Sequence, residues 1–280
     1  MIRKYASSVK YHLKIGVKAI FASQPQSRVA LLHAGRCGST VLGELLNKHS
    51  EICWGGEVFQ AKMLSQRHLA LVGNLRGNKK ILREIEMFQA TKDVYGIEVK
   101  YLPHQHMRRL GLNHAGLVSF LKNSNYSHVI HLTRANLLKQ IVSALIAEAS
   151  NFYHTNQSVD EPNSIYVDVN RIFEEGSWYD KAFKGGVSLL GYLSYALSNQ
   201  QGIDDILENW SVLDLQYEKD IEASPLVAYS KICEYVGVRI EEAPVGLQRT
   251  NPFALSKLIA NYSDVQRHLR NTQFEWMLEE

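Results

Sequence analysis

The stretch spanning residues 28–46 restricts the fold of this chain more than any other. Its first part, residues 28–33, is apolar between its two end residues and is predicted to form a short buried strand. Gly35 and Gly38 favour a tight turn, and from Ser39 onward apolar residues recur at helical spacing. A strand, a glycine turn and a helix start gather several unpaired backbone N–H groups at one point. These amides and the helix dipole attract an anion, above all a phosphate.

This turn differs from a Walker A loop. A Walker loop has a glycine five positions before its Gly-Lys-Ser/Thr, whereas here that position holds His33. Gly38 is followed directly by Ser39, with no lysine between them. The cation lies two residues earlier, at Arg36. The turn therefore retains a phosphate cradle but carries its charge in a different place.

Composition excludes several classes of protein. The chain has 280 residues, 45% of them hydrophobic, which suits one globular domain spanning residues 1–280. Its net charge is only +3 and no dense run of Lys or Arg occurs, so a nucleic-acid partner is not predicted. The three cysteines, Cys37, Cys53 and Cys233, are too few and too widely spaced for a disulfide framework or a zinc motif. A reducing compartment is therefore expected.

The N-terminal segment is basic and weakly amphipathic. Residues 1–21 lack a continuous apolar core, so neither a signal peptide nor a transmembrane segment is predicted. We expect residues 1–27 to form a peripheral helix packed on the domain, with contact to a membrane surface as the alternative. A cytoplasmic location follows as an expectation, and the oligomeric state stays open.

Predicted strands alternate with predicted helices along the chain. After residues 28–33, strands are expected at residues 95–100, 128–132 and 210–215, whereas residues 52–54 form a short apolar piece that ends at the turn of Gly55 and Gly56. This alternation predicts an α/β fold with three layers, α/β/α, around a central parallel sheet. Ligands of such sheets bind at the carboxyl ends of the strands. The glycine turn, Lys100 and Arg134 each follow a predicted strand, so all three are expected to meet at one edge.

Helices are expected between these strands, and one has clear boundaries. Ser224 precedes a proline at the first helical position, and Gly237 stands where a C-cap belongs, which predicts a helix over residues 225–236. Residues 151–200 are predicted to form an insertion on the acceptor side of the domain. Within it, residues 151–164 are polar and residues 173–183 are aromatic, and both are candidate walls for an acceptor.

A second candidate anion site follows the strand at residues 128–132. Arg134 ends this strand, and Ser143 lies nine residues further on, inside the next predicted helix. The guanidinium offers two parallel donors to a phosphate, and the serine hydroxyl adds a neutral one. A ligand with anionic groups at two ends explains the need for two sites.

These segments resemble sulfotransferases that use 3′-phosphoadenosine 5′-phosphosulfate (PAPS). Residues 34–42, AGRCGSTVL, resemble the family's 5′-phosphosulfate loop, and residues 131–143 resemble its 3′-phosphate motif. The arginine in the loop is usual in the carbohydrate-directed type. Golgi members of the family carry an N-terminal membrane anchor, which is not predicted here, so the resemblance implies a bacterial-type enzyme. The resemblance implies a P-loop nucleotide-binding fold and PAPS as co-substrate, with no metal. It assigns donor binding to Arg36, Cys37, Gly38, Ser39, Thr40, Arg134 and Ser143, with Arg249 and Thr250 as C-terminal candidates.

The resemblance also suggests a general base. Residues 55–59, GGEVF, are similar to a Gly-Glu-x-Phe segment of carbohydrate-type members, in which the glutamate is the base; here that residue is Glu57. His104 is the rival, because steroid and phenol sulfotransferases use a histidine close to a lysine that Lys100 matches. The three histidines His104, His106 and His114 lack the spacing of a metal site.

Cys37 follows Arg36 in the loop at a predicted helix N-terminus, where its pKa would fall. The sequence shows neither a base nor an orienting acid beside it, so we interpret it as a small loop residue.

The expected function is transfer of a sulfuryl group from PAPS to a hydroxyl of a carbohydrate or glycolipid-like acceptor, with Glu57 as base and with Arg36 and Lys100 as catalytic cations. A kinase-like P-loop phosphotransferase is one alternative, and the absent Walker lysine opposes it. A non-catalytic nucleotide-binding protein is the other. The acceptor cannot be identified from the sequence.

Overall fold

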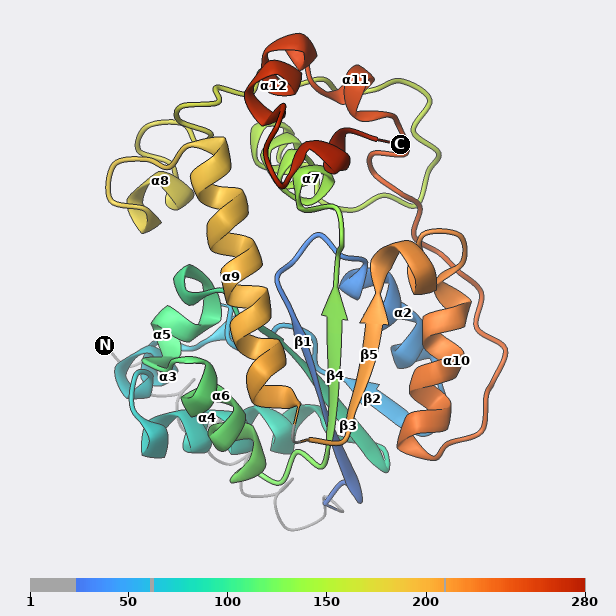
Figure 1. Ribbon diagram of the computed structural model, residues 1–280. Helices are drawn as coiled ribbons and strands as arrows, with labels where there is room; N and C mark the ends of the chain where they lie inside the picture. Colours follow the sequence, from blue (N-terminus) through green and yellow to red (C-terminus); the bar gives the residue numbers. More distant parts are fainter. Residues whose placement is uncertain (1–23, 61–62, 209, 280) are drawn as a thin grey trace, which may run out of the picture.

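The computed structural model describes residues 24–60, 63–208 and 210–279. Most of the predicted peripheral helix, residues 1–23, lies outside the described residues, and its last residue, Ser27, instead begins the first strand. Five strands form one parallel sheet in the order β2-β3-β1-β4-β5 (Figure 1). Their bounds are β1 Ser27–His33, β2 Ile52–Trp54, β3 Val94–Lys100, β4 His128–Thr133 and β5 Val212–Gln216.

Helices fill the connections between the strands, which makes every crossover long enough for parallel pairing. They are α2 Ser39–Lys48, α3 Gln66–Leu71, α4 Leu75–Gln89, α5 Arg108–Leu110, α6 His114–Lys122, α7 Leu137–Ser150, α8 Trp178–Ala182 and α9 Leu189–Leu207. Helices α10 Pro225–Val236, α11 Leu255–Leu258 and α12 Tyr262–Leu269 follow the last strand, β5. Among the described residues there are also the short turns η2 Pro103–Met107, whose backbone is not helical at Gln105, the π-helical η3 Tyr217–Ile221 and the 3-10 helix η4 Glu275–Leu278.

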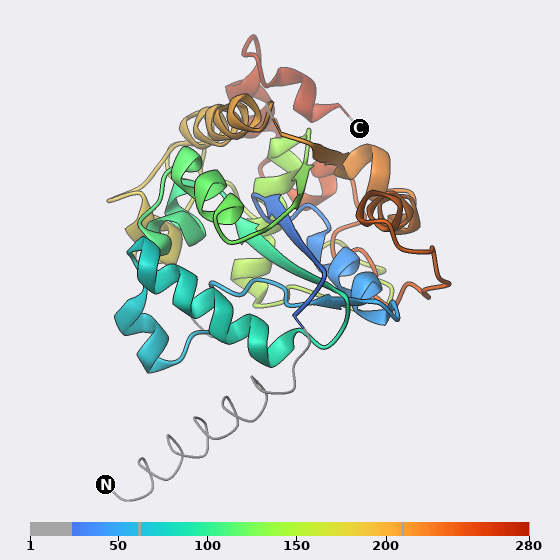
Figure 2. The ribbon, with the colours of Figure 1, turned by 90° about the horizontal axis from the view of Figure 1, so that it is seen from below.

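The central strand β1 is apolar on both sides because helices cover both faces of the sheet. Val29 and Leu31 pack with α2 and α10, whereas Ala30 and Leu32 pack with α4, α6 and the C-terminal part of α9. Figure 2 shows α2 and α10 on the opposite side of the sheet from α4 and α6. These three layers confirm the predicted α/β fold with its central parallel sheet.

A third apolar cluster lies beyond the carboxyl ends of the strands. It joins α7 and the N-terminal part of α9 to α11, α12 and η4 (Figure 1). This cluster forms a cap over the edge at which the predicted site residues end. The cap and the sheet edge therefore enclose the space in which a ligand can bind.

The local predictions agree with this fold in most places. Helix α10 has the bounds predicted from its proline and its glycine cap. The strand expected at residues 210–215 begins two residues later, at Val212. Residues 151–164 contain no helix or strand. Among the helices that the structure describes, none combines the length and the apolar character needed to span a membrane.

Candidate active site

The turn after β1 has a left-handed backbone at three positions. Gly35, Arg36 and Gly38 have φ values of 90°, 53° and 85°. At Gly38 a side chain is also excluded sterically, because a Cβ would lie 2.8 Å from Cγ2 of Ile221. The glycines thus allow the chain to reverse tightly and to enter α2 beside η3.

The carbonyl groups of this turn are occupied by side chains. The backbone oxygens of residues 34–36 accept hydrogen bonds from Gln105 (2.8 Å), Gln140 (2.6 Å) and Arg134 (2.9 Å), respectively. Within the described part of the chain, no side chain caps the N-terminus of α2, where Gly38 is the N-cap residue. The positive end of the helix dipole therefore stays available to an anion.

Arg36 connects three segments that are distant in the sequence. Its Nε and one terminal nitrogen donate to Oγ of Ser143 (3.1 and 2.9 Å), and the same terminal nitrogen donates to Oγ1 of Thr250 (3.1 Å). The other terminal nitrogen donates to the backbone oxygen of Tyr153 (3.2 Å). All of these acceptors are neutral oxygens. Burial, together with the nearby charge of Arg134, lowers the pKa of Arg36, so an anion placed here would stabilise both cations.

Arg134 is held on the other side of the same turn. Its guanidinium carbon lies 4.4 Å from the centre of the Tyr217 ring, and its Nε is 3.8 Å from a carboxylate oxygen of Glu218. Among the described residues, this buried Nε has no hydrogen-bond partner. Burial lowers the pKa of Arg134. A donor left without an acceptor in a buried position is costly, and a bound phosphate oxygen would satisfy it.

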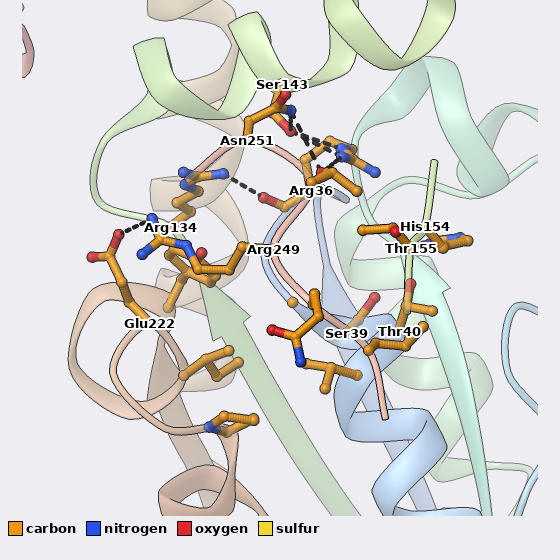
Figure 3. Close-up of a pocket in the computed structure, with 18 of the residues that line it drawn as sticks. Arg36, Ser39, Thr40, Arg134, Ser143, His154, Thr155, Glu222, Arg249 and Asn251 are labelled. Atoms are coloured by element: carbon orange, nitrogen blue, oxygen red, sulfur yellow. Dashed lines mark hydrogen bonds and ion pairs between the residues drawn. The ribbon is translucent and has the colours of Figure 1, made fainter. Parts of the chain in front are cut away.

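A cavity of about 430 Å³ opens beside the two arginines (Figure 3), a volume in the range of small-molecule sites. One wall is the N-terminus of α2, and a second is the segment from η3 to the start of α10. Two loops complete it, residues 153–155 and 247–251, which pair through a single antiparallel bridge between Thr155 and Gln248. The predicted donor residues that line it are Arg36, Gly38, Ser39, Thr40, Arg134, Ser143, Arg249 and Thr250.

The structure thus brings the two predicted anion sites together into one cluster. Arg36 and Ser143, assigned to opposite ends of the ligand, are hydrogen-bonded to each other. Arg249, on the mouth of the cavity, forms an ion pair with Glu222 at 2.8 Å. Cys37 does not line the cavity, since its side chain is fully buried.

Glu57 lies on the other side of the glycine turn, outside this cavity. The turn at Gly55 and Gly56 directs it towards Lys100, whose Nζ is 2.8 Å from Oε1 of Glu57. Lys100 in turn contacts the loop, because its Cε lies 3.3 Å from the position of a Cβ on Gly35. Burial alone would raise the pKa of Glu57, but His106 and Lys100 outweigh it and hold the pKa well below its usual range. Glu57 is therefore an ionised carboxylate next to the loop.

His104, the rival base, also lies in this region. Its Nδ1 is 2.8 Å from the hydroxyl of Tyr195, and its ring packs against Tyr179 and Phe183. Burial and the charge of Lys100 lower the pKa of His104 to about 4. The imidazole is therefore neutral at pH 7.

The side-chain environment of Cys37 differs from the prediction. Its Sγ is 3.6 Å from Nδ1 of His33, and Nε2 of His33 is 3.4 Å from Oε2 of Glu98. The expectation of neither base nor acid beside this cysteine was therefore wrong. Because all three side chains are buried, a substrate does not reach the thiol, and Cys37 remains a packing residue of the loop.

The three histidines considered as a metal site do not converge. His114 faces the backbone oxygen of Tyr101 at 3.1 Å, whereas His104 and His106 face Tyr195 and Glu57. His33, Glu57 and Glu98 do have ligand atoms within 4.8 Å of one another. The ammonium of Lys100 already neutralises Glu57 there.

Several residues of the site were missed by the sequence analysis. Tyr153, His154 and Thr155 belong to the polar segment interpreted as an acceptor wall, but they line the cavity with Arg36. Gln105 and Gln140 hold the loop, and His106 contacts Glu57. Only Gln140 had a usable signal, since it lies within the motif at residues 131–143.

No family model matches the chain, and no curated protein matches it. Among solved structures, a sulfotransferase from Alicyclobacillus acidocaldarius superposes with a TM-score of 0.50 at 12% identity, over 89% of this chain and 90% of that one. A mouse sulfotransferase complexed with PAP gives a lower TM-score of 0.42 at 15% identity, over 81% of this chain and 64% of that one. The chain therefore has the sulfotransferase fold that the resemblance of its motifs predicted.

Proposed function

We propose that this protein is a PAPS-dependent sulfotransferase that transfers a sulfuryl group to a hydroxyl acceptor without a metal. The observation that supports it best is the pair of partly buried arginines at the N-terminus of α2. Arg36 contacts only neutral oxygens among its hydrogen-bond partners, and Arg134 has an unsatisfied Nε among the described residues. Two such cations favour a ligand with more than one anionic group.

The donor would occupy the cavity beside the glycine turn. The amides of residues 36–40 and the Arg36 guanidinium would hold its 5′-phosphosulfate, and Arg134, Ser143, Arg249 and Thr250 would hold its 3′-phosphate. The apolar lining at Val41, Pro225 and Leu247 suits a flat purine base. The whole chain would then serve as one catalytic domain.

The reaction needs a proton acceptor and a stabilised leaving group. In our proposal Glu57 takes the proton of the acceptor hydroxyl while the hydroxyl oxygen forms a bond to sulfur. The bond between sulfur and the bridging oxygen of the 5′-phosphate breaks, and its electron pair leaves with 3′,5′-adenosine diphosphate. Arg36 and the α2 amides stabilise the charge that develops on this phosphate. Lys100 holds Glu57 beside the loop.

The acceptor class is proposed to be a carbohydrate or a glycolipid-like molecule. Aromatic side chains gather next to His104, where the rings of Phe173 and Tyr179 stack with centroids 4.6 Å apart. Phe173 is buried, but Tyr179 and Phe183 are half-buried beside His104, and partly exposed aromatic faces of this kind bind sugar rings. The aromatic part of residues 151–200 is therefore the proposed acceptor side, and its polar part, residues 153–155, belongs to the donor cavity.

Calorimetry with 3′,5′-adenosine diphosphate and with ADP tests the donor, and transfer of labelled sulfate from PAPS to a panel of sugars and glycolipids tests the reaction. We expect a clear preference for 3′,5′-adenosine diphosphate, and we expect transfer that Glu57→Gln abolishes and His104→Gln retains. Loss of transfer in His104→Gln alone would make His104 the base. Mg²⁺-dependent ATP turnover would point to a phosphotransferase. Tight binding of the nucleotide without any sulfate transfer would point to a non-catalytic binding protein.

A further inference from the structure

The carboxylate of Glu57 is held from two sides. Nζ of Lys100 lies 2.8 Å from its Oε1, and Nε2 of His106 lies 3.4 Å from its Oε2. The amide of Gln60 also donates to Oε2. Both oxygens therefore have a partner, so the plane of the carboxylate is fixed and not only its position.

The carboxyl end of β3 determines which ring nitrogen of His106 carries the proton. The backbone N–H of Lys100 donates to Nδ1 of His106 at 3.1 Å. Because Nδ1 is an acceptor, the ring proton must be on Nε2, the nitrogen that faces Glu57. Burial lowers the pKa of His106, which keeps the ring neutral near pH 7. His106 thus donates to Glu57 without adding a second positive charge.

The orientation of the His106 ring is also restricted. The side chain is buried, and Phe59 packs edge-on against it with ring centres 6.5 Å apart. Its backbone belongs to the short turn η2, in which Gln105 donates to the glycine turn. One short segment therefore fixes both the loop and the histidine beside Glu57.

We propose that His106 is a positioning residue for Glu57, which it holds together with Lys100 in the orientation required to accept a proton. This inference rests on the proposed role of Glu57 as base. The physical reason is that proton transfer depends steeply on the position of the base, and without His106 only the amide of Gln60 holds Oε2. The ammonium of Lys100 supplies a positive charge, and the imidazole of His106 supplies a directional hydrogen bond.

Three variants separate this role from a merely structural one. His106→Leu removes the donor, and His106→Gln retains an amide N–H near the position of Nε2. His114→Leu is the matched control, since His114 bonds to a backbone oxygen and does not contact Glu57. Transfer kinetics with PAPS measure kcat and KM. Imidazole ¹⁵N NMR reports the His106 tautomer. Carboxyl ¹³C NMR measures the Glu57 pKa in a Lys100→Met background, in which loss of the ammonium raises it into an accessible range.

We expect NMR to find the proton of His106 on Nε2. In His106→Leu we expect kcat to fall roughly 10- to 100-fold, while KM for PAPS stays within about twofold because the donor cavity is separate. His106→Gln should recover most of kcat, and the Glu57 pKa should rise by about one unit in His106→Leu and not in His114→Leu.

A proton on Nδ1 would overturn the inference. So would a wild-type kcat in His106→Leu, or a Glu57 pKa that His106→Leu leaves unchanged. If the wild type transfers sulfate to no acceptor, the proposed function fails, whereas the carboxyl titration still decides whether His106 holds Glu57.

Discussion

Removal of the Arg36 side chain tests the donor site most directly. Its Nε and one terminal nitrogen now both donate to Oγ of Ser143, at 3.1 and 2.9 Å. A phosphate would exchange these neutral contacts for two charge-assisted bonds, each of which contributes about 1.5–3 kcal/mol, against about 1 kcal/mol for a neutral one. Arg36→Ala should therefore weaken binding of 3′,5′-adenosine diphosphate by about 2–3 kcal/mol, or roughly 30- to 150-fold.

Isothermal titration calorimetry at fixed salt measures this loss, and urea denaturation verifies that the variant is folded. The control is Arg239→Ala, which removes the same charge from a side chain that is 82% exposed and does not line the cavity. We expect its affinity to stay within about twofold of the wild type, because distant surface charges are screened. An affinity of Arg36→Ala within threefold of the wild type would refute the reasoning. An equal loss in Arg239→Ala would show that net charge alone attracts the ligand.

Three further predictions concern the loop and its supports. Gly38→Ala should lower the free energy of unfolding, measured in urea, by about 2–3 kcal/mol, because φ is +85° and the new Cβ meets Ile221. Its control is Gly237→Ala, which should cost only about 1 kcal/mol because φ is +77° but the space around the new Cβ is open. Gln140→Leu should cost about 1–3 kcal/mol in the same assay, since the carbonyl of Gly35 loses its partner; no change would mean that another group replaces it. Because the pKa of Glu57 is depressed in the folded protein, its ion pair stabilises the fold above about pH 4.5 and this contribution is lost as the pH falls. Acid titration of unfolding should therefore show a smaller decrease below pH 4.5 in Glu57→Gln than in the wild type, and equal slopes would contradict the ion pair.

The sequence predicted those parts of the site that are determined locally. A buried strand, two glycines and a helical stripe specify the turn at Gly35 and Gly38 whatever packs around it. Lys100 and Arg134 were predicted to approach this turn because the carboxyl ends of parallel strands meet at one edge. Glu57 was predicted from the resemblance of residues 55–59 to a segment of carbohydrate-type sulfotransferases. In the structure it lies beside the loop.

The remaining residues depend on packing that has no sequence period. His106 follows Gln105, whose backbone is not helical (φ −93°, ψ −127°), and no periodic pattern in the sequence predicts a kink at this position. The segment at residues 153–155 has no regular structure, and a single bridge between Thr155 and Gln248 places it over the cavity. His33 lies four residues before Cys37, but an imidazole at the end of a strand gave no indication that it would turn back to the thiol.

The order of the strands explains why donor and base lie on opposite sides of one loop. β1 pairs with β3 on one side, where His33 is opposite Lys100, and with β4 on the other, where His33 is opposite Leu132. Lys100, the last residue of β3, therefore approaches the turn from the side of Glu57, whereas Arg134, just after β4, approaches it from the side of the cavity. The turn at Gly35 and Arg36 therefore lies between Glu57 and the cavity, and Gly35 adds no side chain there. In the proposed reaction, this makes the crest of the loop the position of the sulfuryl group.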